Sequence, residues 1–187
     1  NNLMHFTADD GYYGREVWYA QSGGEGLVLV SDINLNAGQG SSPEDLTVSG
    51  SKLFYSADNG VNGRELYAGL TLIDIHPAGS SNPTNLTDVN GVLYFADDNG
   101  VDGIEPFQSD GTVGGTSQLA NLAPFSASSN PSDFLEAGGT IYFAADQYTS
   151  GVFSEKFTGI SGTSIASLTG HANYPNSPNE TTILDKF

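Results

Sequence analysis

An internal repeat runs through the chain and restricts the fold more than any other feature of the sequence. A proline that follows serine or asparagine recurs after 40, 48 and 47 residues. A period of this length is typical of a β-propeller, in which each repeat forms one small antiparallel sheet, or blade. The four copies of the dipeptide are Ser42-Pro43, Asn82-Pro83, Asn130-Pro131 and Ser177-Pro178.

Each repeat predicts four short strands. The first follows the proline, and the second is rich in aromatic and branched residues, as at 53–57. A turn of Asp, Asn and Gly then supplies the positive φ angles of a hairpin, and a third strand opens with a glutamate. The second repeat is short after its third strand, so its outer hairpin is expected to be reduced. The fourth strands are expected at 32–33, 74–75 and 121–122.

The repeat frame predicts an all-β chain that folds as one propeller domain over residues 1–187. The sequence begins in a second strand and ends in a first strand. Residues 179–187 are therefore expected to pair with 3–8 and close a ring of four blades, which leaves no unpaired sheet edge. An open solenoid is the alternative, although it needs capping ends. The expected blades are 3–33 with 177–187, 42–75, 82–122 and 130–168.

The third repeat contains the stretch Glu105-Pro106-Phe107-Gln108-Ser109-Asp110-Gly111-Thr112. It resembles the bacterial repeat named for its motif Glu-Leu-Trp-x-x-Asp-Gly-Thr, with Pro and Phe at the Leu and Trp positions. The first repeat keeps this frame loosely from Glu16-Val17-Trp18, and the fourth is degenerate. The resemblance covers nearly the whole chain and implies a secreted bacterial protein with a propeller-like repeat. It implies far less about activity.

The charge of the chain excludes several classes of function. Acidic residues outnumber basic ones by 22 to 5, and the formal net charge is −17. This charge repels phosphate backbones and anionic lipids, so nucleic-acid binding is excluded. No apolar run approaches the ~18 residues that span a bilayer, so membrane insertion is not expected. The chain has no cysteine, and its acidic, glycine-rich β composition fits a secreted prokaryotic protein.

One polar position recurs two residues after each proline. Because the first strand is the innermost strand of a propeller blade, four side-chain oxygens are expected to face one point in a narrow channel. Three are anionic without a nearby Lys or Arg, so a hard cation is expected to offset their repulsion. Calcium is favoured over Mg²⁺ or Na⁺. The alternative is that these side chains cap turns or bind channel water. They are Asp45, Asn85, Asp133 and Glu180.

Other chemistry-bearing residues have simpler explanations. The histidines His5, His76 and His171 occupy different repeat positions, so they form no repeated ligand set. No Gly-x-Ser-x-Gly element supports a serine nucleophile. The pairs Asp9/Asp10 and Asp97/Asp98 favour hairpin turns held by Asx side chains over acid/base work on a sugar.

The loop at 58–60, followed by Glu65, offers oxygen ligands for a peripheral calcium ion. Arg15 and Arg64 nevertheless stand directly beside Glu16 and Glu65. This adjacency favours ordinary ion pairing at the surface over metal binding.

Three tyrosines near the expected hairpin turns, Tyr12, Tyr13 and Tyr148, are candidates for stacking on a sugar, or else cover the blade edge. The leading interpretation is therefore a secreted or cell-surface, non-catalytic binding module with a structural metal, which engages a glycan or an extracellular protein. A polysaccharide-active hydrolase or lyase is the first alternative, because propellers host such sites. A structural subunit of an extracellular assembly is the second. The oligomeric state is left open.

Overall fold

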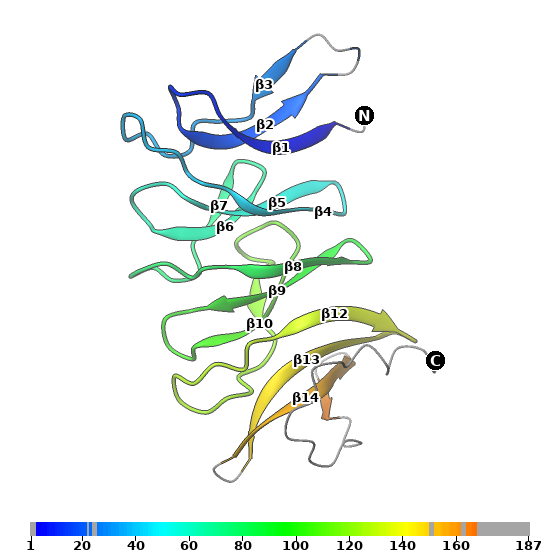
Figure 1. The fold of residues 1–187 in the computed structure, drawn as a ribbon. Helices are drawn as coiled ribbons and strands as arrows, with labels where there is room; N and C mark the ends of the chain where they lie inside the picture. Colours follow the sequence, from blue (N-terminus) through cyan, green and yellow to red (C-terminus); the bar gives the residue numbers. More distant parts are fainter. Residues whose placement is uncertain (1–2, 22, 24–25, 150–151, 162–163, 168–187) are drawn as a thin grey trace.

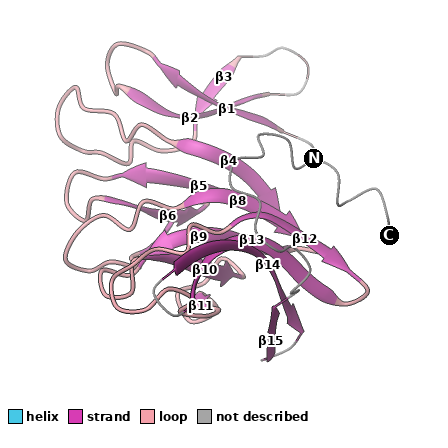
Figure 2. Ribbon diagram, turned by 60° about the horizontal axis from the view of Figure 1, so that its bottom comes forward, coloured by secondary structure: helices cyan, strands magenta, loops and turns pink. Residues whose placement is uncertain are grey.

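The computed structural model describes residues 3–21, 23, 26–149, 152–161 and 164–167, with side chains as far as Asp146. Across these residues the chain is all-β, as predicted. Strands β1 to β15 form four antiparallel sheets, and no helix occurs among them (Figures 1 and 2).

Each sheet is a meander whose consecutive strands are neighbours, which confirms the predicted strand order within a repeat. Sheet I contains β1 (Met4–Asp9), β2 (Arg15–Ala20) and β3 (Leu27–Leu29), and sheet II contains β4 (Glu44–Ser49), β5 (Lys52–Asp58), β6 (Arg64–Ala68) and β7 (Thr71–Ile73). Sheet III contains β8 (Thr84–Val89), β9 (Val92–Asp98), β10 (Ile104–Ser109) and β11 (Ser117–Gln118), and sheet IV contains β12 (Ser132–Ala137), β13 (Thr140–Thr149), β14 (Val152–Ser161) and β15 (Ser164–Ser167).

The fourth strand of each repeat lies earlier than the sequence predicts. It is β3, β7 or β11 in the first three repeats, whereas residues 32–33, 74–75 and 121–122 belong to the linkers that follow. In the second repeat the reason is visible, because the Ile75 amide donates to the Glu65 carboxylate instead of to a neighbouring strand. The outer hairpin of that repeat is short but complete, since only Gly69 and Leu70 separate β6 from β7.

Apolar side chains fill the space between successive sheets. Phe54 on β5 packs with Leu93 and Phe95 of sheet III, whereas its neighbour Tyr55 packs with Val17 of sheet I. Successive residues of a strand point to opposite faces, so a sheet that is covered on both sides needs apolar residues in succession. This requirement explains the unbroken aromatic and branched runs of the second strands.

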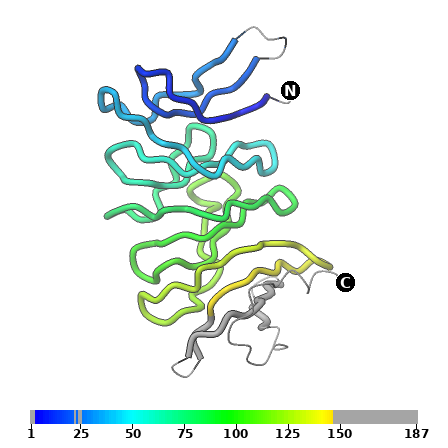
Figure 3. Tube along the Cα trace, in the orientation of Figure 1, coloured from blue at the N-terminus to red at the C-terminus, as the bar shows by residue number. Residues whose placement is uncertain are grey.

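The four sheets follow one another as a row from sheet I to sheet IV (Figures 1 and 3). The first strands of sheets II, III and IV lie in series, with β8 in contact with both β4 and β12, and β1 contacts β4. We call β4, β8 and β12 the inner strands. No described strand pairs with the edge of β1 that faces away from β2. Residues 179–187, which are predicted to close the ring at this edge, lie outside the described residues. Four sheets are therefore seen in a row, and the closed four-bladed ring stays a prediction.

Candidate functional site

The inner strands share an irregular segment around the repeated proline. The pairing register shifts between Glu44 and Thr47, and it shifts in the same way at the two equivalent places on β8 and β12. Two residues per segment adopt the left-handed conformation, as Ser42 (φ 48°) and Asp45 (φ 55°) do on entry to β4. Such a bulge bends the strand and re-aims a side chain. The equivalent residues are Asn82 and Asn85, then Asn130 and Asp133.

The three bulges face one shared cavity. Its volume is ≈ 490 Å³, and Asp45, Asn85 and Asp133 all line it. The structure therefore brings together the three predicted ligands that it describes, whereas Glu180 lies outside the described residues. Asn85 donates from Nδ2 to the carbonyl of Pro131 at 3.0 Å, and Thr47 donates from Oγ1 to the carbonyl of Leu86 at 3.1 Å. These two bonds join neighbouring inner strands.

The oxygens of this row are largely free. All three side chains are exposed, and within the described ranges Asp133 accepts a bond only from the hydroxyl of the adjacent Ser132, at 3.1 Å. Among the described residues, no donor reaches the carboxylate of Asp45, and no three His, Cys, Asp or Glu side chains are grouped closely enough to hold a metal. The left-handed bulge is itself an independent reason for Asp and Asn, because both residue types tolerate positive φ.

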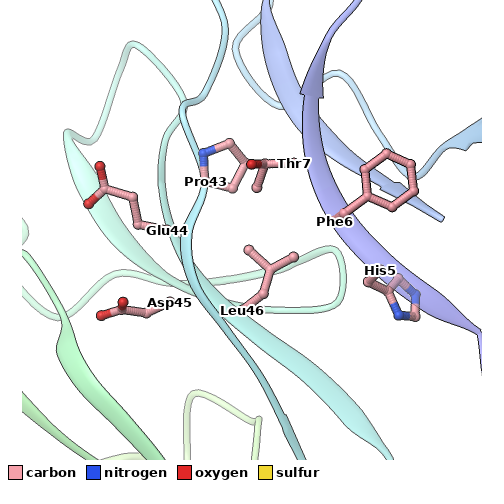
Figure 4. Close-up of a pocket in the computed structure, with 7 residues that line it drawn as sticks. All are labelled: His5, Phe6, Thr7, Pro43, Glu44, Asp45 and Leu46. Atoms are coloured by element: carbon pink, nitrogen blue, oxygen red, sulfur yellow. The ribbon is translucent and has the colours of Figure 1, made fainter.

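A second cavity of ≈ 470 Å³ separates β1 from β4 (Figure 4). His5, Phe6 and Thr7 line it from β1, and residues 43–46 line it from the other side. The carboxylate of Asp45 points away from His5, toward the neighbouring sheet III (Figure 4). The cavity thus lies along the unpaired edge of β1. At the equivalent edge of the aromatic strand, β4 pairs with β5 in sheet II and β8 pairs with β9 in sheet III.

The glutamate that opens each third strand is buried, so the expectation of surface ion pairs is wrong. Glu16, Glu65 and Glu105 are all 0% exposed. Arg64 instead contacts Glu44 at 3.9 Å, and Arg15 donates to Thr7. Burial raises the pKa of all three glutamates, and hydrogen bonds from protein donors partly offset the rise.

Each buried glutamate binds the linker that leads to the next sheet. Glu16 accepts from the amide (2.7 Å) and the hydroxyl (2.5 Å) of Ser41. Glu65 accepts the same two groups of Ser81, at 2.9 and 2.7 Å, together with the Ile75 amide at 2.9 Å. Glu105 accepts the hydroxyl of Ser129 at 2.6 Å and the amides of Leu122 and Ala123 at 3.0 and 3.1 Å. The motif glutamate is therefore a structural acceptor, and Glu65 is not placed to serve a calcium ion in the loop at 58–60.

The hairpin aspartates form the turns that the sequence predicts, with one exception. Asp9 accepts the amide of Gly11 at 2.8 Å, and Asp98 accepts the amide of Gly100 at 2.7 Å. Asp97 instead lies inside β9, is 0% exposed, and leaves its Oδ2 without a partner among the described residues. Burial, with the charges of Glu65 and Asp98, raises its pKa well above the usual range. Sheet II has Ala57 at the equivalent place.

The tyrosines and histidines do not form one site. Tyr12 is 73% exposed, and its ring lies 4.7 Å from that of the half-buried Tyr13. The side chain of Tyr148 lies outside the described part. His5 lies beside Tyr19 on sheet I, and His76 holds a turn through Nδ1 and the Ser80 carbonyl at 3.2 Å. His171 is not described.

The Asp-Gly-Thr part of the motif is also a packed turn. Thr112 donates its amide to Asp110 at 2.9 Å, and Lys52 of sheet II donates to the Asp110 carbonyl at 2.8 Å. Gly111 has a φ of +82°, a conformation that favours glycine, and the end of the Lys52 side chain lies close to it. The residues of the motif therefore join sheets, and none of them lines the cavity between the bulges. Within the described ranges, no helix is long and apolar enough to cross a membrane.

No protein-family model and no curated protein matches the chain. Among solved structures, it is similar to one described as the crystal structure of the computationally designed Ika8 protein, at 14% identity and a TM-score of 0.40. The match covers 88% of this chain and 54% of the designed one. The chain thus spans about half the length of that protein.

Proposed function

We propose that the chain is a secreted, non-catalytic binding module, a four-bladed β-propeller whose inner strands hold one cation. Calcium is the preferred ion, ahead of Mg²⁺ or Na⁺, and its ligands are Asp45, Asn85, Asp133 and Glu180. A glycan or an extracellular protein is the partner class. The resemblance of residues 105–112 to the secreted bacterial repeat and the net charge of −17 support the extracellular location.

The observation that carries the proposal is the shared cavity between the bulges. Three side chains from three different sheets line it, and two of them are carboxylates. Among the described residues, no Lys or Arg lines the cavity, so none of them supplies a counter-charge to the carboxylates there. Calcium accepts six to eight oxygens and uses carboxylate, amide, carbonyl and water oxygens together. The mixture of donors at these bulges suits that ion.

The unpaired edge of β1 supports ring closure. In the other sheets an inner strand pairs with the edge of the aromatic strand, whereas β1 has no described partner at that edge and a cavity separates it from β4. An exposed strand edge is a template for pairing with a further strand. The proposal places residues 179–187 at this edge, which also brings Glu180 toward the inner strands.

Burial argues against the enzyme alternative at the best-placed carboxylates. Asp97 lies opposite Glu105 on the neighbouring strand, yet both side chains are fully buried. An enzyme that hydrolyses a polysaccharide needs two carboxyl groups about 5–10 Å apart that the substrate can reach. This pair offers no such access.

Elemental analysis and thermal unfolding test the cation. The whole chain, equilibrated with calcium and dialysed, is expected to retain about one ion, and a chelator is expected to lower its Tm. Asp45→Asn and Asp133→Asn keep a residue that tolerates positive φ, so they remove charge without straining the bulge. Each is expected to weaken calcium retention. Glu44→Gln, an exposed neighbour on β4, is the matched control and should behave as the parent chain does.

Two results together would overturn the cation: no metal in the purified chain, and a Tm that the chelator leaves unchanged. Deletion of residues 179–187 tests closure separately. The shortened chain is expected to lose cooperative unfolding, because β1 would keep an open edge. An unchanged melting curve would show that this segment closes nothing.

A further inference from the structure

The turns and linkers on one edge of the sheets form a continuous ridge. It comprises the turns at 9–14, 58–63 and 98–103 and the linkers at 30–43, 74–83 and 119–131. All of these loops lie on the same side of the row of sheets (Figures 1 and 2). We call this surface the loop ridge.

Contacts between alternating turns and linkers make the loop ridge continuous. A β-carbon at Gly14 would collide with the backbone of Gly40, and one at Gly100 would collide with the His76 ring. Arg64, directly after the second turn, donates its amide to Ser80 of the second linker at 3.0 Å, and Ile104 donates in the same way to Ser128. Each linker therefore lies against the turns of its own sheet, and the first two linkers also contact the turn of the next sheet.

Large apolar side chains project from the loop ridge at regular places. The three turns carry one each at the equivalent position, and two of the three linkers carry one. Their exposed fractions include the four highest among the large apolar residues of the described part. The residues are Tyr12 (73%), Leu35 (81%), Val61 (86%), Val101 (71%) and Phe125 (89%).

Phe125 adopts a conformation that does not suit its side chain. Its φ is +63°, in a turn closed by a bond from the Ala127 amide to the Pro124 carbonyl at 3.3 Å. Bulky residues are outliers at such angles, where glycine is favoured. A solvent-exposed phenylalanine at this place gains no packing in the fold. Its presence is therefore better explained by a contact outside the chain.

The charge of the loop ridge selects the kind of partner. Its segments contain seven aspartates, of which two are exposed and five are half-buried, and no Lys or Arg, although Arg15 and Arg64 directly follow the first two turns. Amides of Tyr13 and Tyr12 lower the pKa of Asp10, so that carboxylate stays charged beside Tyr12. An acidic surface with apolar projections complements one that carries Lys or Arg together with apolar side chains. A second copy of this acidic chain and an anionic membrane are disfavoured for the same reason.

The residue types on the loop ridge also favour a protein over a glycan as the partner. Sugars stack on aromatic rings, and Tyr12 supplies one, but the equivalent places in the next two turns are valines. A row that repeats apolar character without repeating aromaticity suits apolar side chains of a protein.

We infer that the loop ridge is a docking surface for a basic protein segment with apolar anchors. This inference deepens the proposed binding module by naming its partner class, and it does not depend on the cation. The exposed apolar residues supply the anchoring contacts, and the aspartates between them supply charge complementarity and orientation.

A displayed library of random 16-residue peptides provides the probe. Peptides selected on the whole chain are expected to combine Lys or Arg with Leu, Ile or Phe. The variant Val61→Ser/Val101→Ser/Phe125→Ser keeps every charge, and it is expected to bind them at least tenfold more weakly. Val48→Ser/Leu70→Ser removes two exposed apolar residues away from the loop ridge and should bind as the parent chain does.

Phe125→Gly gives a second readout. It relieves the unfavourable φ, so it is expected to raise the Tm while lowering peptide affinity, a combination that a merely structural residue would not produce. Equal binding by parent and triple variant, or selected peptides without basic residues, would overturn the inference. So would binding on a glycan array, or to phosphatidylserine vesicles, that the triple variant loses. The calcium response of the Tm in the triple variant reports separately on the proposed cation.

Discussion

Two rows of side-chain oxygens recur along the chain, and they differ in what surrounds them. Glu16, Glu65 and Glu105 are fully buried, and serine and backbone donors bind their carboxylates. The bulge row of Asp45, Asn85 and Asp133 is exposed and faces a shared cavity. Each repeat therefore has one oxygen acceptor, the glutamate, that the protein itself uses, and a second, the bulge residue, that remains available to a ligand.

This contrast shows why the presence of a carboxylate in a motif says little about its role. The number of protein donors around it is more informative, because a buried acceptor with its donors in place has no capacity left for a ligand. Asp97 lies between the two cases, since it is buried like the glutamates but one of its oxygens has no donor in the described part of the chain.

The largest expected effect comes from breaking the glutamate row. Glu65→Ala removes the acceptor of the Ile75 amide and of the buried Ser81 hydroxyl, and it leaves the Ser81 amide with only its bond to the Arg64 carbonyl. Unsatisfied buried donors cost about 1–3 kcal/mol each, and the variant is expected to lose on the order of 3 kcal/mol of unfolding free energy. Urea denaturation at pH 7 measures the loss.

Glu44→Ala is the control for that variant. Its one ion pair with Arg64 is long and exposed, so its loss is expected to cost less than about 0.5 kcal/mol. If Glu65→Ala also costs less than about 1 kcal/mol, the buried glutamates do not hold the linkers.

Replacement of Asp97 by alanine is expected to stabilise the chain. The change copies Ala57 of sheet II and removes a buried carboxyl oxygen that lacks a donor. A gain of about 1–2 kcal/mol at pH 7.5 follows from the usual cost of such a group. Destabilisation by Asp97→Ala in the same urea series would mean that the carboxyl has a partner after all.

The buried carboxyls also make stability depend on pH. Burial raises the pKa of Glu16, Glu65, Glu105 and Asp97, so the folded chain holds protons that the unfolded chain releases. Their contribution is therefore fully present below the ordinary carboxyl pKa of about 4 and is lost as the pH rises through the raised values.

The free energy of unfolding is consequently expected to be higher at pH 5 than at pH 7.5. Asp97→Ala should reduce this difference, because one of the four groups is removed. Urea series at both pH values measure it. A chain that is more stable at pH 7.5, or a variant with an unchanged slope, would show that the carboxyls are already ionised in the fold.

The smallest change in unfolding free energy is expected for substitutions in the bulge row when no metal is bound. Asp45→Ala places alanine at a φ of 55° and is expected to cost about 1 kcal/mol in a chelator. Asp45→Asn tolerates that conformation and should change the unfolding free energy by less than about 0.5 kcal/mol. If the two variants are equally unstable, charge rather than backbone conformation decides the residue at this place.

The sequence was sufficient for the all-β class and the order of the strands within a repeat, and it singled out the polar position of Asp45, Asn85 and Asp133, because each depends on a local pattern that repeats. It did not predict the bulges at that position. It misplaced the fourth strands and the glutamates, since both depend on a contact between distant segments. Arg64 beside Glu65 suggested a surface pair, yet the two side chains point to different surroundings.

One signal in the sequence would have located the buried glutamates. A serine stands two residues before three of the repeated prolines, at Ser41, Ser81 and Ser129. A glutamate and a serine that recur together predict a mutual contact. The repeat also locates Asp97. When Asp58-Asn59-Gly60 is aligned with Asp98-Asn99-Gly100, Asp97 falls at the strand position of Ala57, ahead of the turn.

Calcium titration of the whole chain by isothermal calorimetry, at pH 7.5 and 0.15 M salt, tests the central claim most directly. The claim is that the bulge row is free to bind one ion while the glutamate row is not. The parent chain is expected to give a single-site isotherm with about one ion bound, and Asp45→Asn/Asp133→Asn is expected to abolish it. No heat of binding, many weak equivalent sites, or an isotherm that the double variant leaves unchanged would contradict the claim.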